Sequence, residues 1–324
     1  MKQDVRCDHM GTFGTIGVVF LLGLGFQIPQ TWAIECGATL EGGKFKLTKN
    51  VTCDSNTTPV DVPAITLESD STLDLNGFAV LCNDTEDRKG IVLEGRKIKL
   101  QNGVISGCRK GIVVTGMKHK LKDLLVINNG RDGLEFDESD DNQVKNVHAN
   151  FNGRTGLNIV RSNGNRVDDS SATNNGRQGF KIDGRADPDE RMDAAKDNAI
   201  RNSAAYLNCR DGIEIDEGDD NSVMGSIAVS NGNQAACVAF EGSFRPQFYA
   251  GFDVTDGSNF NTLKNNKASG NQGCNILPGE SECEPRERNL WDENADGGGC
   301  FSSNLWKNNR VDGVKVEPEC SPGP

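Results

Sequence analysis

Apolar and polar residues alternate over short runs through the middle of the chain, and the alternation restarts at regular intervals. Each run follows a glycine in the pattern R-x-G-[ILF]-x-[ILVF] or a close variant of it. Alternation with a period of two predicts short β-strands, and the Asn and Gly residues between the runs predict turns. The steps between aligned glycines are 21, 22, 23, 23, 33 and 39 residues, for the series Gly90, Gly111, Gly133, Gly156, Gly179, Gly212 and Gly251.

A unit repeated at this period predicts a solenoid, in which each unit stacks on the next. The units lack the Ala- and Leu-rich faces of helical repeats, and they lack both the L-x-x-L-x-L of leucine-rich repeats and the G-G-x-G-x-D of the calcium β-roll. Three short strands and three turns fit in a step of 22 or 23 residues. Each unit is therefore predicted to be one coil of a parallel β-helix, with its inward apolar residues stacked into a narrow core.

Two further motifs carry a family resemblance. The L-D-L-N-G at residues 73–77, echoed by L-Q-N-G at residues 100–103, together with the repeats from Gly90 to Gly273, resembles right-handed parallel β-helix proteins of the pectin-lyase-like superfamily. The resemblance is to the carbohydrate-binding and sugar-hydrolysis domain type. It implies an all-β, single-stranded, right-handed solenoid with capped ends. It implies no single activity, because this superfamily contains lyases, hydrolases, epimerases, phage spikes and non-catalytic modules.

The N-terminal segment has the layout of a secretory signal peptide. Basic residues precede an apolar run at residues 13–26, and Thr31 and Ala33 supply the small side chains of a cleavage site. The run is shorter than the roughly 20 residues that span a bilayer. We therefore predict a signal peptide at residues 1–33, a secreted or periplasmic protein, and no membrane span after cleavage.

The cysteines fit an exported protein. Ten remain once Cys7 leaves with the signal, and an even number in such a chain predicts disulfides. Cys82 and Cys108 occupy the same place in successive coils, and a coil spacing of about 4.8 Å suits a disulfide. Cys209 at a coil-closing turn and Cys237 in a nearby insertion suggest a further pair.

The ends of the repeat are expected to differ from its middle, since an uncovered coil would expose both core and strand edge. Residues 34–64 are predicted to form an N-terminal cap, tied down by Cys36 and Cys53. The repeats occupy residues 65–273. Residues 274–324, rich in Cys, Gly and Pro, are predicted to form a C-terminal cap or tail.

Asparagines recur at the turns of successive units. Asn tolerates left-handed turn geometry, and stacked Asn side chains can hydrogen-bond from one coil to the next. We therefore predict a structural role for the columns, whose coil-closing members are Asn129, Asn152, Asn175, Asn208, Asn231 and Asn271.

Charged residues gather at two outward positions of the later coils. The second and fourth residues after each aligned glycine place Lys181 and Asp183 beside Glu214 and Asp216, and Asp253 extends the group by one coil. Stacked pairs would lie about 4.8 Å apart and strand neighbours roughly 7 Å apart. Two insertions, at the steps of 33 and 39 residues, adjoin this square and could wall a groove.

Stacked carboxylates repel one another unless a cation lies among them. Either Lys181 neutralises them in a surface ion network, or Asp183, Glu214 and Asp216 bind Ca²⁺. In residue type the group is similar to pectate-lyase-like sites, and this resemblance implies Lys181, Asp183 and Asp216 as catalytic residues, with Lys181 as the base. Three neighbouring carboxylates should, however, raise the pKa of Lys181, which makes it a poor base unless Ca²⁺ takes up their charge.

Aromatic and polar residues nearby are candidates for sugar contacts. Arg245, Phe248 and Tyr249 lie in the second insertion, and we expect them, with Glu214 and Asp253, to bind substrate. Burial of the loop against the coils is the alternative for the aromatic residues. Trp291 and Trp306 of the C-terminal region could likewise contact sugar or be buried, and burial in the cap is the preferred prediction.

Two functions follow. The first is a secreted β-helix protein that binds polysaccharide or a cell-surface partner, with or without calcium. The second is a calcium-dependent polyuronate lyase acting by β-elimination. The net charge of −12 argues against nucleic acid as a partner. Of the twin blocks that begin at Arg131 and Arg210, the second is predicted to carry the site, because only there do all four charges of the square meet.

Overall fold

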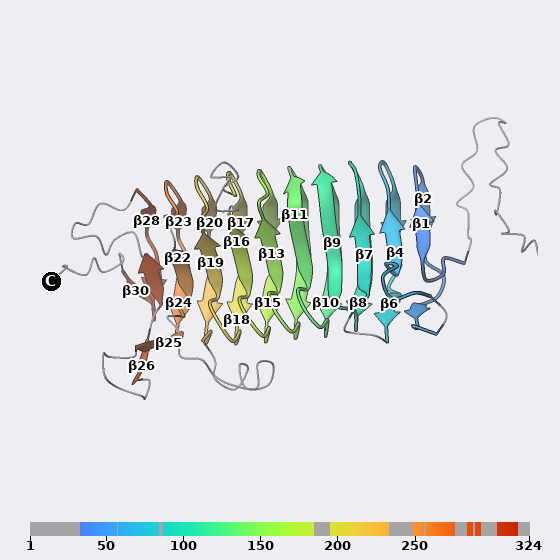
Figure 1. Cartoon of the computed structure of the whole chain (residues 1–324). Coiled ribbons are helices and arrows are strands. Elements are labelled where there is room, and N and C mark those ends of the chain that lie inside the picture. Colours follow the sequence, from blue (N-terminus) through green and yellow to red (C-terminus); the bar gives the residue numbers. More distant parts are fainter. Residues whose placement is uncertain are drawn as a thin grey trace, which may run out of the picture.

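The strands wind into a single elongated solenoid (Figure 1). The computed structural model describes residues 33–56, 58–83, 87–184, 195–232, 249–255, 257–275, 284–287, 289–292 and 303–316. Every regular element in these ranges is a β-strand. The described residues contain no helix that could span a membrane. The predicted all-β, right-handed parallel β-helix is confirmed.

One face of the solenoid, here called sheet A, is a ten-stranded parallel sheet that runs the length of the molecule. Each strand pairs with the strand at the same place in the next coil, because the repeat returns the chain to the same face once per coil. The strands are β1 (Ala38–Leu40), β4 (Ile65–Leu67), β7 (Lys89–Leu93), β9 (Lys110–Met117), β11 (Leu134–Asp140), β13 (Leu157–Val160), β16 (Phe180–Asp183), β19 (Ile213–Asp216), β22 (Phe252–Thr255) and β27 (Leu290–Asp292).

The other two faces share three long strands, β8 (Lys99–Ser106), β10 (Lys120–Ile127) and β12 (Gln143–Asn150). β10 pairs with β8 and β12 along its whole length, whereas the two halves of β8 and of β12 pair with different short strands on their other sides. Elsewhere each face has its own short strands. One holds β2 (Lys44–Lys46), β5 (Thr72–Asp74), β14 (Arg166–Asp168), β17 (Ala199–Arg201), β20 (Ser222–Met224), β23 (Thr262–Lys264) and β28 (Leu305–Lys307). The other holds β3 (Val51–Cys53), β6 (Ala79–Cys82), β15 (Ser171–Thr173), β18 (Ala204–Tyr206), β21 (Ile227–Val229), β24 (Lys267–Ser269) and β29 (Arg310–Val311).

Two antiparallel pairings occur near the C-terminal end. They join β25 (Gln272–Asn275) to β26 (Glu284–Glu287), and β29 to β30 (Val314–Lys315). Within the last coils Trp306 is buried, and its indole Nε1–H donates to Asp292 Oδ2 at 3.0 Å. The expectation that Trp306 is buried in the C-terminal region is confirmed.

The core is a set of stacked apolar columns. On sheet A the inward position after the motif glycine stacks Leu157 on Phe180 and Phe180 on Ile213, and each is about 1% exposed. The glycine itself is required by close approach of the backbone. A Cβ at Gly179 would lie 2.7 Å from the carbonyl oxygen of Gly212, and one at Gly212 would lie 2.5 Å from that of Gly251. No other residue fits at this corner without moving the coils apart.

The asparagine columns are hydrogen-bonded ladders, as predicted. Buried Asn175 accepts from the backbone N–H of Asn152 at 3.0 Å and donates to Asn208 Oδ1 at 2.9 Å and to the Ala149 carbonyl at 2.9 Å. A second ladder repeats the pattern at the next corner, through Asn142, Asn165, Asn198, Asn221, Asn261 and Asn304. Each side chain satisfies buried backbone groups that the turn leaves without strand partners.

Two disulfides close the N-terminal coils. Cys82–Cys108, predicted from their equivalent places, is formed with its Cα atoms 4.8 Å apart, and Cys36 pairs with Cys53 at 5.3 Å. Cys209 is disulfide-bonded, whereas Cys237 lies outside the described residues. Residues 38–53 already form β1, β2 and β3, which pair in register with the next coil. The predicted signal peptide falls almost entirely outside the described residues.

Candidate functional site

Strand register brings the predicted square together on the outer side of sheet A. Lys181 on β16 pairs with Glu214 on β19, and Asp183 pairs with Asp216. The next coil places Asp253 of β22 opposite Glu214. We call Lys181, Asp183, Glu214 and Asp216 the charged cluster.

The ammonium group of Lys181 lies at the centre of the charged cluster. Its Nζ atom is 2.5 Å from Asp216 Oδ2 and 3.3 Å from Glu214 Oε1. A third carboxylate oxygen, Asp183 Oδ2, lies at 3.4 Å. One cation therefore serves three carboxylates, and the cluster keeps a formal charge of −2.

The cluster faces outward from the sheet and yet is nearly closed off from solvent. The exposed fractions are 7% for Lys181 and 8% for Glu214. Asp183 and Asp216 are exposed to 8% and 7%. The surface ion network considered from the sequence is thus a buried network. Desolvating four charges costs several kcal/mol per ion, and apolar side chains at these outward positions would stack at least as well. Stability of the coils therefore does not account for the cluster.

The environment of Lys181 fixes its protonation state. Burial alone would lower the pKa of Lys181, but the carboxylates of Glu214, Asp183 and Asp216 outweigh burial and raise the pKa above its ordinary value. The side chain is therefore a charged ammonium at neutral pH. A proton-abstracting role for Lys181 is disfavoured, as its neighbours in the sequence led us to expect.

A second pair of acidic groups adjoins the cluster. Burial raises the pKa of Asp211 well above its ordinary value, and the Glu214 carboxylate raises it further, although Asp211 accepts a 2.5 Å hydrogen bond from the Ala250 N–H. Burial also raises the pKa of Glu214, against the opposing charge of Lys181 and a hydrogen bond from Gln178 Nε2. Asp211 and Glu214 are therefore suited to hold a proton, as is Glu135 of the first twin block, whose pKa burial also raises.

Replacing Asp211 with asparagine should stabilise the protein at neutral and higher pH. A folded-state pKa above the unfolded value gives stability that is complete below the unfolded pKa and is lost as pH rises through the folded pKa. Asn cannot titrate, so the melting temperature of Asp211→Asn should exceed that of the wild type by about 2–4 °C at high pH, and the two should converge in acid. Melting curves from about pH 4 to pH 9 measure the difference.

Asp211→Ala is the matched control for this substitution. Alanine also removes the charge but leaves the Ala250 N–H without its acceptor, so this variant should melt below Asp211→Asn at every pH. If the difference in melting temperature between the wild type and Asp211→Asn does not change with pH, the raised pKa of Asp211 is contradicted.

Calcium does not fit the charged cluster as it stands, because the Lys181 ammonium fills the space between the three carboxylates. Within the described ranges no group of three or more His, Cys, Asp or Glu side chains has the geometry of a metal site. Binding of Ca²⁺ by Asp183, Glu214 and Asp216 would require Lys181 to leave. The calcium site stays a prediction.

The other predicted substrate-binding residues divide into two groups. Arg245 and Phe248 lie outside the described residues, as do both insertions for most of their length. Tyr249 is 4% exposed, and its ring lies 6.0 Å from the guanidinium carbon of Arg210. The alternative of burial therefore holds for Tyr249. Asp253 is 3% exposed.

Two residues at this site, Gln178 and Asp211, were not predicted from the sequence, and the register of Trp291 was not predicted either. Gln178 and Asp211 directly precede the motif glycines, and the hydrogen bond from Gln178 to Glu214 shows that this position points to the same outer face. The recurring R-x-G pattern was the available signal. Trp291 stacks in register with Asp253 on the outward column and is half-buried. The irregular spacing after Gly251 concealed that register.

The first twin block lacks such a cluster. Glu135 lies 2.5 Å from Lys110 Nζ, and Asp137 lies 3.0 Å from Arg161. Each carboxylate thus has its own cation, and their strand partners on β13 are Asn158 and an apolar residue. The preference for the second block over the first rests on this difference.

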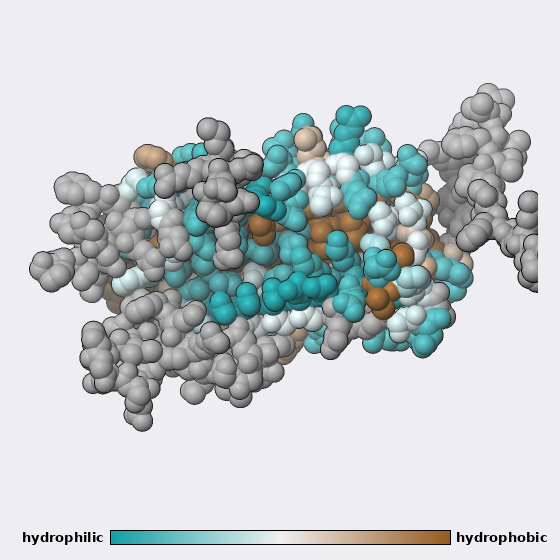
Figure 2. All heavy atoms as spheres, viewed as in Figure 1, coloured by the Kyte–Doolittle hydropathy of each residue, from teal (hydrophilic) through white to brown (hydrophobic). Residues whose placement is uncertain are grey.

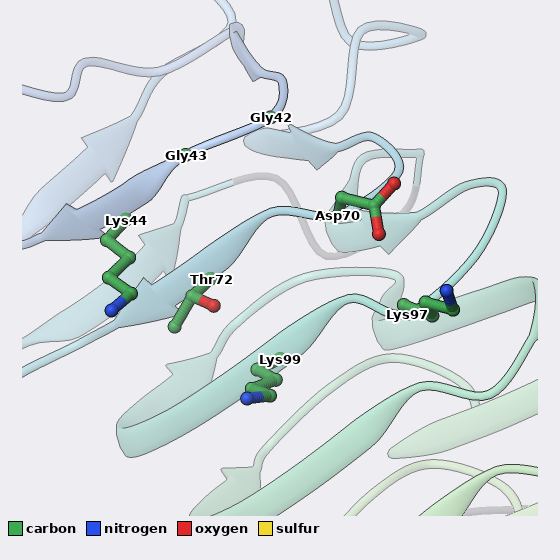
Figure 3. A pocket seen from close by; sticks show the side chains of 7 residues that line it. All are labelled: Gly42, Gly43, Lys44, Asp70, Thr72, Lys97 and Lys99. Carbon is green, nitrogen blue, oxygen red and sulfur yellow. The ribbon is translucent and has the colours of Figure 1, made fainter.

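A cationic cavity lies on another face, near the N-terminal end. Figure 3 shows Lys44, Thr72 and Lys99 extending from neighbouring strands, with Asp70 and Lys97 on the turns before them. The cavity volume is about 390 Å³. All three lysines are exposed to solvent, and the cavity is distant in sequence from the charged cluster.

The fold and the outward cluster together define a right-handed parallel β-helix protein with a polar site on its long sheet. A family model described as "Right handed beta helix region" matches residues 48–190 and again residues 89–249. The matches cover more than half of the chain, which therefore belongs to this family. No curated protein matches the sequence.

Solved structures show the same fold. The Dettilon tailspike protein gp208 aligns with a TM-score of 0.59 and 12% identity, over 83% of this chain and 62% of its own. The C387A mutant of DFA-IIIase from Arthrobacter chlorophenolicus A6, in complex with DFA-III, aligns with a TM-score of 0.53 and 12% identity, over 86% and 71%. This chain thus spans less than two thirds of the tailspike. At these identities the likenesses show the parallel β-helix fold alone.

Proposed function

We propose that this is an exported β-helix protein that binds a polysaccharide on the outer side of sheet A, at the coils of Lys181, Glu214 and Asp253. The observation that carries the proposal is the charged cluster, which is buried on a face where the fold needs no charge. Perturbed, desolvated groups that packing does not require are characteristic of functional sites.

The neighbouring groups suit a sugar ligand. Carboxylates accept hydrogen bonds from hydroxyl groups, and half-buried Trp291, one coil beyond Asp253, offers an aromatic face beside them. Disulfides at Cys36–Cys53 and Cys82–Cys108 support export to an oxidising compartment, as the predicted signal peptide does. A secreted or periplasmic protein would meet polysaccharide or cell-surface glycan as its partner.

A glycan-modifying enzyme is the second candidate function. The observation in its favour is the pair Asp211 and Glu214, whose raised pKa values suit a proton donor or acceptor. For the polyuronate lyase considered from the sequence, Asp183 and Asp216 would contribute charge. The proton abstraction would then pass from Lys181 to one of the raised carboxyls.

Affinity electrophoresis in gels that contain pectate, alginate, xylan or dextran tests the binding proposal. The mobility of the wild type should fall in at least one gel. Glu214→Gln should weaken that interaction about tenfold, because it changes the hydrogen-bonding atoms at the centre of the site. Glu135→Gln, at the same place in the twin block, should leave the interaction unchanged.

Equal weakening by both variants, or no retardation in any gel, would contradict a site at the second block. Incubation with each polymer, followed by ultraviolet absorbance of unsaturated products, separates binding from β-elimination. A melting curve with and without millimolar calcium tests the metal, and an unchanged melting temperature argues against it.

A further inference from the structure

An unbroken row of arginines runs along the edge of sheet A where its strands begin. In five successive coils the residue two places before the motif glycine is arginine, and its backbone N–H donates to the carbonyl of the arginine one coil earlier. We call the half-exposed members the arginine row, which consists of Arg109, Arg131, Arg154, Arg177 and Arg210. Figure 2 shows a continuous hydrophilic row along this edge.

The arginine that begins this register is used within the fold and is not counted in the row. Arg88 is fully buried, and its guanidinium donates to the carbonyls of Thr58, Pro59 and Val62 at 2.7–2.9 Å. Packing therefore accounts for Arg88. The same account does not extend to Arg109, Arg131 and Arg154, whose side chains are half-exposed.

The positive charges of the row lie close enough to repel one another. Burial lowers the pKa of Arg131 below its ordinary value, and the guanidinium groups of Arg154 and Arg109 lower it further, against the carboxylates of Asp132 and Glu135, which raise it. Among the described residues no carboxylate lies within ion-pair distance of Arg109, Arg131 or Arg154. A chain with a net charge of −12 thus keeps cations stacked side by side. An anion laid along the row would relieve the repulsion among these cations.

The spacing of the row selects a polymer. One guanidinium per coil gives a repeat of about 4.8 Å, comparable with the length of one sugar unit, and five coils extend over roughly 19 Å. Each guanidinium presents a planar fork that binds a carboxylate through two parallel hydrogen bonds.

We propose that the arginine row binds one chain of a carboxylated polysaccharide, laid along the solenoid axis with about one sugar carboxylate per coil. The proposal rests on the proposed function and adds the charge class and direction of the ligand. Arg177 and Arg210 directly precede the coils of the charged cluster, so a chain on the row passes beside Lys181 and Glu214. Duplex DNA is disfavoured, since it carries a charge every 1.7 Å or so, a spacing that does not match one guanidinium per coil of about 4.8 Å.

Calorimetric titration with polygalacturonate tests the row. The triple variant R131Q/R154Q/R177Q should bind at least about tenfold more weakly than the wild type, with a shallower dependence on salt. The triple variant R131K/R154K/R177K keeps the charge and should lie between them, because lysine lacks the fork. K44Q/K97Q/K99Q removes the same charge from the cavity in Figure 3 and should bind like the wild type.

Other results overturn the proposal. If R131Q/R154Q/R177Q and K44Q/K97Q/K99Q weaken polygalacturonate binding equally, the protein attracts anions in general and the row is not the site. Wild-type binding to neutral dextran, unaffected by the arginine variants, would overturn the row while polysaccharide binding stands. No binding to any polysaccharide would overturn both proposals. Tighter binding to duplex DNA than to polygalacturonate would overturn the polysaccharide assignment. Circular dichroism melting curves of all three triple variants check that each one is folded.

Discussion

Replacing Lys181 with methionine should lower the free energy of unfolding by roughly 3–5 kcal/mol, the usual cost of removing one partner from a buried ionic group. Lys181 is 7% exposed, and its ammonium group lies within 3.4 Å of three carboxylate oxygens. Without it, Asp183, Glu214 and Asp216 remain buried with no cation at their centre. Urea unfolding followed by circular dichroism measures the loss.

Lys145→Met is the matched control on the same solenoid. Lys145 lies 3.6 Å from Asp169, but the two side chains are 61% and 47% exposed, so its loss should cost less than about 1 kcal/mol. Similar losses for the two variants would show that the charged cluster is solvated like any surface pair. Addition of calcium offers a second comparison. A rescue of Lys181→Met that the wild type does not show would mean that the carboxylates can hold the metal once the ammonium is gone.

Replacing Asn175 with alanine should lower the free energy of unfolding by roughly 3 kcal/mol. Its side chain makes two hydrogen bonds to Asn152 at 3.0 Å each, and it donates to Asn208 and to the Ala149 carbonyl. Each buried polar group left without a partner costs about 1–3 kcal/mol, and the Asn152 N–H loses its acceptor altogether. The same unfolding experiment measures the effect.

An exposed asparagine provides the comparison for this ladder. Asn163 accepts one hydrogen bond at 2.9 Å, from the Lys196 N–H, and Asn163→Ala should cost less than about 1 kcal/mol. Because each coil contacts only its neighbours, the Asn175 variant should also speed amide exchange mainly in the coils beside it. Uniform acceleration along the solenoid, or equal losses for the two variants, would contradict a local ladder.

The charged cluster illustrates what sequence reasoning could and could not reach. The neighbours Lys181–Glu214 and Asp183–Asp216 followed from counting residues after the motif glycine, because one coil sets the register for the next. Their burial did not follow, because strand alternation distinguishes inward from outward positions and does not show what covers an outward one. The buried carboxyl of Asp211 and the outward register of Trp291 needed the packed structure for the same reason.

By itself the sequence determined the parallel β-helix, the requirement for glycine at the corner of Gly179, the asparagine ladders and the Cys82–Cys108 bridge. All of these depend on contacts between equivalent positions in adjacent coils, and the repeat length alone fixes those contacts. Only the tertiary structure decided that Lys181 reaches three carboxylates at once and that desolvation raises the pKa of Glu214. Side-chain reach and desolvation depend on the distances among all neighbouring groups in space, which no linear spacing contains.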